Sequence, residues 1–246
     1  MDLTANALVA LYFACSNESH HDENGELIIL DIPDTEVKYW DSDTVAILAA
    51  LSLQNQNLNI NHSIIFSEIY AQLMDIEYDT NHKKHEDETS KFNEIAKNIT
   101  ESIGLPNYSI MKMLAKEERH QKNYLEMFNQ QPAIISLLHD IHTDKPSFRP
   151  VINPTDLARV LCVRAKLNNA RISRQQGCFL LFGINNEKRN PAEIPDDWKR
   201  LPTKGKRFIV RNKKQIMQEL KAFGISRQTL FPELESQAQE IMAQYE

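Results

Sequence analysis

The feature that most constrains the fold is a long helical middle with short β-rich runs on its two sides. Between about residues 42 and 142, apolar residues recur at the spacing that places them on one face of a helix. They include Ile47, Leu51, Ile65, Ile69, Leu73, Phe92, Ile95 and Ile99. Runs typical of strands occur at 26–31, 160–163, 178–182 and 208–210.

We therefore predict an α+β protein, in which a small β-sheet built from the two chain ends accompanies a large helical insertion. Residues 1–41 and 145–246 would form the α+β domain, and residues 42–144 the helical insertion or subdomain. Within the first segment, Thr4 is suited to cap a helix over residues 5–15. That helix is apolar on nearly every face, so we expect it to be buried, and we expect residues 26–31 to form a buried strand.

Charge is divided unevenly along the sequence. Residues 1–123 contain nine Lys and Arg against twenty-one Asp and Glu, a net charge of −12, whereas the remainder contains nineteen against thirteen, a net charge of +6. The segment from Lys199 to Lys214 is rich in cations and contains no acid. It predicts a phosphate patch formed by Lys204, Lys206, Arg207 and Arg211. The alternative is a solvated loop that balances the acidic half.

The total charge of −6 and the shortage of aromatic residues in this segment argue against a nucleic-acid partner, although the basic patch leaves such a partner open.

Cys15, Cys162 and Cys178 each lie among apolar residues, which favours buried thiols in a reducing compartment. His82 and His85 lie in the most polar stretch without a third metal ligand, so we expect no metal. The apolar run at 8–15 is too short to span a bilayer, so we expect a cytoplasmic protein without a membrane partner.

A polar cluster lies immediately before the most β-like run of the chain. It consists of Arg171, Arg174, Gln175 and Gln176. Guanidinium groups suit phosphate or carboxylate, and amides suit base edges or a nicotinamide-like group. No nucleophile elbow, phosphate loop or dinucleotide glycine pattern accompanies the cluster. A ligand-binding cleft is one interpretation, and a simple turn whose arginines pair with the acidic half is the other.

Three stretches together resemble the FRG family. Residues 2–14 are similar to its Asp-aromatic-Thr-x-Asn-Pro-Leu-Val-Ala-Leu-Tyr-Phe-Ala pattern, with Leu3 replacing the aromatic residue and Ala7 the proline. Residues 169–179 resemble Asn-x-Arg-x-x-x-Gln-x-Gly-x-Phe, and residues 223–234 resemble Gly-Ile-x-x-x-Thr-Leu-Phe-Pro-Asp-Leu. The order is that of the family. The Phe/Tyr-Arg-Gly segment that gives the family its name is missing, so the resemblance implies an N-terminally truncated domain.

The resemblance invites comparison with ADP-ribosyltransferases, as an analogy of fold alone. In that comparison Thr4 and Asn6 would line the nicotinamide-ribose side, and Gln175 or Gln176 would stand at the late acidic position, where an amide cannot ionise. The candidate ligand-binding residues are therefore Asp2, Thr4, Asn6, Arg171, Arg174, Gln175 and Gln176, with NAD as the candidate cofactor. The alternative is a non-catalytic interaction module of a bacterial or phage stress or defence system. No catalytic residue is assigned.

Overall fold

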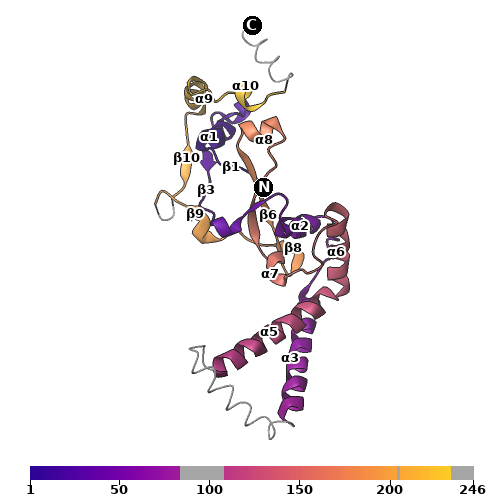
Figure 1. Cartoon of the computed structure of the whole chain (residues 1–246). Coiled ribbons are helices and arrows are strands. Elements are labelled where there is room, and N and C mark those ends of the chain that lie inside the picture. Colours follow the sequence, from indigo (N-terminus) through magenta and orange to yellow (C-terminus); the bar gives the residue numbers. More distant parts are fainter. Residues whose placement is uncertain (84–107, 204–205, 234–246) are drawn as a thin grey trace. The chain divides into compact units, whose positions relative to one another are not determined.

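The computed structural model describes residues 1–83, 108–203 and 206–233, and it divides into two compact units. Unit 1 comprises Met1–Ala49, Arg159–Gly183 and Ala192–Glu246, and unit 2 comprises Ala50–Ala158 and Ile184–Pro191. Figure 1 shows the elements of both. The largest sheet of the described residues belongs to unit 1, and the long helices belong to unit 2.

A four-stranded sheet forms the centre of unit 1. Its strands are β1 (Asp2–Thr4), β4 (Val37–Tyr39), β5 (Val160–Arg164) and β6 (Gly177–Phe182), in the order β1-β6-β5-β4. β6 pairs antiparallel with both of its neighbours, and β4 runs parallel to β5. Val160, Leu180 and Trp198 belong to the core packed on these strands. The predicted α+β fold, with a sheet that joins the N-terminus to the later part of the chain, is confirmed.

Unit 1 contains four helices and most of a fifth among its described residues. They are α1 (Ala7–Cys15), α2 (Asp43–Ala50), α8 (Ala170–Arg174), α9 (Lys213–Ala222) and α10 (Arg227–Leu230), with short 3-10 turns η1 (Glu18–His20), η2 (Asp34–Glu36) and η3 (Asp196–Trp198). Val9 and Tyr12 of α1 pack with Leu220 and Leu230 in a second core cluster. Phe13 on the other side of α1 is 44% exposed, so the expectation of a fully buried helix is wrong. Only one side of α1 is covered by α9 and α10.

Two small antiparallel ribbons complete unit 1. β2 (Gly25–Leu27) pairs with β10 (Phe208–Val210), and β3 (Ile29–Leu30) pairs with β9 (Lys199–Arg200). The predicted single buried strand at 26–31 is therefore wrong, since the run pairs with two different partners. Ile28, between the two strands, is 67% exposed, because a two-stranded ribbon leaves one face to solvent.

Unit 2 contains α3 (Asn61–Lys83), α5 (Tyr108–Asn129), α6 (Pro132–Asp144) and α7 (Pro154–Leu157), with a hairpin of β7 (Ile184–Asn185) and β8 (Glu187–Pro191). Phe128, Ile134, Leu137 and Ile141 are among its most completely buried helical side chains. The side chains of His82 and His85, and the predicted helical run through Phe92, Ile95 and Ile99, lie outside the described residues. Among the described residues, no helix combines the length and apolarity that crossing a bilayer requires.

Candidate ligand-binding site

The N-terminal strand is joined to the turn that precedes β6. Thr4 lies opposite Gly177 in the β1–β6 ladder. The Thr4 hydroxyl donates to the carbonyl oxygen of Gln175 at 2.7 Å, and the Ala5 N–H donates to the carbonyl oxygen of Gln176 at 3.0 Å. Antiparallel pairing thus brings the early and late candidate residues together, although Thr4 and Gln175 are 171 positions apart.

The start of α1 is fixed by Asn6 rather than by Thr4. The Asn6 side-chain oxygen accepts hydrogen bonds from the backbone N–H groups of Leu8 at 2.9 Å and Val9 at 3.4 Å. The prediction that Thr4 caps this helix is therefore wrong, because Thr4 is still held extended by β6. Its hydroxyl instead accepts the Asn6 N–H at 3.0 Å and so supports the true cap.

Side chains of the polar cluster hold the C-terminal motif against α8. The Gln175 amide nitrogen donates to the carbonyl oxygen of Leu230 at 3.2 Å, and an Arg174 guanidinium nitrogen donates to that of Thr229 at 3.4 Å. The Arg171 guanidinium carbon lies 4.7 Å from the centroid of the Phe231 ring, within cation–π range. These three contacts hold residues 229–231 against the polar cluster without a ligand, so the cluster serves the fold.

Gln176 adopts a backbone conformation that is rare outside glycine. Its φ angle is 48°, in the left-handed region, which costs about 1 kcal/mol for a residue with a side chain. Hydrogen bonds on both sides of the residue hold it there: its N–H donates to the Ser173 carbonyl oxygen at 3.2 Å, and its own carbonyl accepts from Ala5. Strain of this kind is concentrated at binding and catalytic sites, where it aims a side chain.

An open pocket of about 560 Å³ lies where these segments meet. It is lined by Asn6, Arg174, Gln176, Gly224, Ile225, Gln228, Thr229 and Leu230. Arg174 belongs to α8, and Gln228, Thr229 and Leu230 belong to α10, two helices that lie close together in Figure 1. A volume of this size is within the usual range for sites that bind small molecules.

Three of the predicted residues line this pocket, namely Asn6, Arg174 and Gln176. The other four do not belong to its lining. Asp2 is exposed at the start of β1, opposite Phe179. Thr4, Gln175 and Arg171 are engaged in the contacts described above.

The wall contributed by residues 224–230 was not predicted as part of a site. Gly224 ends α9 with a φ of 79°, and the Ile225 N–H then donates to the Leu220 carbonyl oxygen at 2.9 Å. Ser226 and Thr229 form a reciprocal capping box at the start of α10. The helix-ending glycine and the Ser-x-x-Thr spacing are both readable in the sequence and could have indicated a compact turn facing the polar cluster.

Arg174 is the one ionisable side chain among the described residues that line the pocket. The chain has no Asp or Glu between Val160 and Asn186, a segment that contains Arg164, Lys166 and Arg171 as well as Arg174. The positive charge of Arg174 in the lining suits an anion. With amides and a hydroxyl as the other polar groups, the lining offers hydrogen bonds but no acid or base to move a proton.

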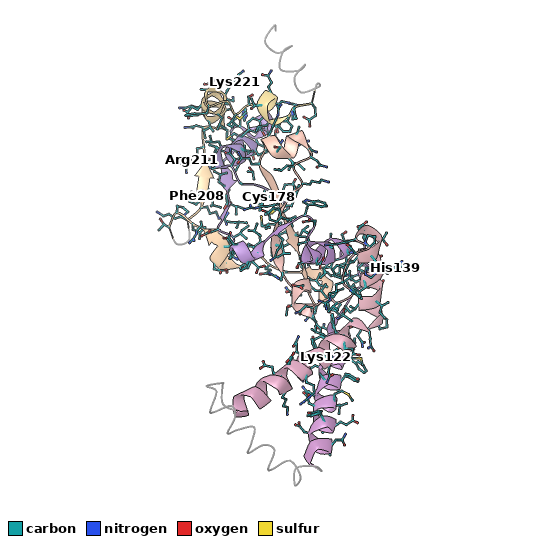
Figure 2. The ribbon with its side chains drawn as sticks, in the orientation of Figure 1. Lys122, His139, Cys178, Phe208, Arg211 and Lys221 are labelled. Carbon is teal, nitrogen blue, oxygen red and sulfur yellow. The ribbon has the colours of Figure 1, made fainter. Side chains whose placement is uncertain are left out.

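One of the four residues of the predicted phosphate patch, Arg207, is paired within unit 1, and two other cations of the basic segment, Arg200 and Lys213, also have partners there. Arg200 pairs with Asp31, Arg207 pairs with Glu26 at 3.3 Å, and the buried Lys213 donates to the carbonyl oxygen of His20 at 2.9 Å. Lys206 and Arg211 are exposed, and Arg211 directly follows β10, the strand that begins at Phe208 (Figure 2). Lys204 lies outside the described residues.

Two thiols share a hydrogen bond between β5 and β6. The bond from Cys178 lowers the pKa of Cys162 from 9.0 to about 7, and Arg164 lowers that pKa further, whereas burial opposes both. The same bond and burial raise the pKa of Cys178, which is labelled in Figure 2. No group of three or more His, Cys, Asp or Glu side chains within the described ranges is placed to hold a metal ion.

Comparisons with protein families, with curated proteins and with solved structures find no match for this chain. The resemblance to the FRG family therefore stays a prediction from the three sequence motifs. The structural observation beside it is that parts of all three motifs, at Asn6, at Arg174 and Gln176, and at residues 224–230, line one pocket.

Proposed function

We propose that this chain is an FRG-domain protein whose unit 1 binds a nucleotide, with NAD as one candidate. The observation that carries the proposal is the convergence of the three motifs on one pocket with a single cation. A nucleotide combines a phosphate, a planar apolar face and polar edges. The pocket has a counterpart to each of these chemical features.

Arg174 is the residue proposed to contact the phosphate. Its guanidinium group makes one long hydrogen bond, of 3.4 Å, to the Thr229 carbonyl and is otherwise exposed, so donors remain for a ligand. Ile225 and Leu230 supply apolar surface for a base or a sugar. The amides of Asn6 and Gln176 supply hydrogen bonds for its edges.

The proposal is for binding rather than for a reaction. Transfer of an ADP-ribose group is assisted by a carboxylate that stabilises the positive charge developing on the ribose. The described lining includes Gln176 and no carboxylate. We therefore assign no catalytic residue and expect the ligand to be recovered unchanged.

Calorimetric titration of the full chain with NAD, ADP-ribose and AMP in separate experiments tests the proposal. We expect heat of binding from at least one of the three. Arg174→Ala should weaken that binding by about 10- to 100-fold, the effect of losing a hydrogen bond to a charged group. Arg174→Lys should be intermediate, because it keeps the charge and loses the paired donors.

Arg211→Ala is the matched control, since Arg211 is an exposed arginine of the same unit in the basic segment. We expect it to change the affinity by no more than about twofold, as for other surface substitutions. An equal loss of affinity from both variants would indicate that the ligand binds at the basic segment. The absence of heat with all three ligands would remove the proposal.

A further inference from the structure

The buried face of α3 carries small and polar side chains. Ser63, Ser67, Ala71 and Asp75 recur at four-residue intervals, and each is at most 8% exposed. The Ser67 hydroxyl donates to the carbonyl oxygen of Ser63 at 2.6 Å, within the helix. Asp75 pairs with two residues of α5: Arg119 at 3.3 Å and His120 at 2.8 Å. Polar pairs of Asp75 thus join α3 to α5.

The opposite face of α3 is apolar and exposed. Ile65, Phe66, Ile69, Leu73 and Ile76 are 57%, 54%, 50%, 56% and 62% exposed, respectively. A surface helix of a globular protein normally places such residues toward the core and polar residues toward water. In α3 the arrangement is inverted. A continuous apolar stripe on a helix exposed in this way marks an interaction surface.

The spacing of the stripe identifies the kind of partner that it fits. Phe66, Ile69, Leu73 and Ile76 follow one another at intervals of three, four and three residues, the a and d positions of two heptads. That spacing keeps large apolar side chains on one seam for more than two turns. Its complement is another helix with a seam of the same kind.

We propose that the occupant is α3 of a second copy of this chain, running antiparallel. In an antiparallel pair centred between Ile69 and Leu73, each of these residues faces the other on the partner helix, and Phe66 faces Ile76. The stripe is therefore complementary to itself under a two-fold axis, which is the requirement for a symmetric dimer. The surface belongs to unit 2 and is independent of the proposed nucleotide pocket.

Charge favours the antiparallel direction over the parallel one. The acid beside the stripe, Glu77, lies toward its C-terminal end, whereas Asp79 pairs with Lys116 of α5. An antiparallel pair places the two copies of Glu77 at opposite ends of the interface, whereas a parallel pair would bring them together. At the centre of the antiparallel pair the flanking residues are Tyr70 and Gln72, which carry no charge at neutral pH.

The area of the stripe is sufficient for a specific contact. Five side chains of this size at about half exposure offer roughly 500 Å² per copy, so a symmetric pair buries about 1,000 Å² from the stripe alone. Specific interfaces begin near that value. The flanking residues add to it.

Sedimentation equilibrium of the full chain tests the dimer. We expect the wild-type protein to dimerise at micromolar concentration, and Leu73→Glu to raise the dissociation constant at least about 100-fold, because two charges enter one apolar seam. Circular dichroism should remain unchanged, since Leu73 is exposed in the single copy. The matched control is Ile135→Glu, which alters an isoleucine of α6 that is 53% exposed and should leave the dimer intact.

A wild-type protein that stays monomeric up to about 100 µM would overturn the proposal, as would a Leu73→Glu variant that dimerises normally. If the wild type is monomeric and Leu73→Glu lowers its stability, a segment of the same chain covers the stripe, which also overturns the proposal.

Disulfide crosslinking tests the direction. The cysteine introduced by Gln72→Cys would lie close to its counterpart in the antiparallel pair, so the two should crosslink on oxidation. Ile65→Cys should not, because residue 65 of the partner lies about 18 Å away along the helix axis. Equal crosslinking at both positions would indicate a parallel pair and overturn the antiparallel arrangement.

Discussion

Unit 1 and the helix pair of unit 2 use polar side chains in different places. In unit 1, Thr4, Asn6 and Gln175 bind backbone groups where strands and helices end, and apolar residues fill the cores. Between α3 and α5, the buried Asp75 pairs with the half-buried Arg119 and His120, and the large apolar residues on the other side of α3 face water. A conspicuous polar motif can therefore serve mainly to hold the fold together, whereas apolar residues at an ordinary helical spacing can form an exposed surface.

The comparison is tested most strongly by two leucines in opposite environments. Leu230 is 2% exposed in the core cluster of α1, α9 and α10, and Leu73 is 56% exposed on α3. Leu230→Ala should lower the free energy of unfolding of unit 1 by about 3 kcal/mol through lost burial and a cavity. Chemical denaturation at low protein concentration measures this.

Leu73→Ala under the same conditions should change the free energy of unfolding by no more than about 0.5 kcal/mol, because the side chain already faces water. A cost comparable with that of Leu230→Ala would mean that the stripe is covered within a single copy, and the contrast between the two units would fail.

A second pair of variants tests whether the polar contact between α3 and α5 stabilises unit 2. Asp75→Asn keeps the shape of the side chain but removes the charge that Arg119 and His120 contact. We expect a loss of about 2 kcal/mol in the free energy of unfolding of unit 2, since Arg119 and His120 would lose the charge of their buried partner. Hydrogen exchange of the α5 amides reports the change locally.

Glu77→Gln removes an exposed charge two residues further along α3 and serves as the control. We expect it to change the free energy of unfolding of unit 2 by no more than about 0.5 kcal/mol. Equal effects of the two variants would show that the pairing of Asp75 contributes nothing specific.

The smallest expected effect concerns the thiol pair of unit 1. Because the Cys178 thiol donates to Cys162, the pKa of Cys162 is lowered to about 7, so its thiolate forms as the pH rises through that value. The rate of alkylation of Cys162, followed by mass spectrometry, should therefore rise with a midpoint near pH 7. In Cys178→Ala the hydrogen bond is lost, and the midpoint should move up toward the ordinary value of 9.0.

Cys15, which has no such thiol partner and whose pKa is raised by burial, provides the internal control. Its alkylation should rise only at higher pH in both proteins. A midpoint for Cys162 that does not change in Cys178→Ala would show that the hydrogen bond does not set its pKa.

Much of the architecture could be predicted from local patterns. The helical spacing of the middle segment and the β-rich runs at the chain ends are properties of neighbouring residues, and they predicted the α+β fold. The motif residues Asn6, Arg174 and Gln176 were also selected from the sequence, and all three line the pocket.

The sequence could not show which contacts each side chain makes in the folded protein. Whether Thr4 caps a helix depends on its pairing with β6, which lies far along the chain. Whether Gln175 or Gln176 faces the pocket depends on a left-handed turn held by Ala5. The apolar spacing of α3 predicted a helix but not the side that is covered, because periodicity records only the neighbours along a chain. Burial is decided by what packs against each face, and that is a property of the tertiary structure.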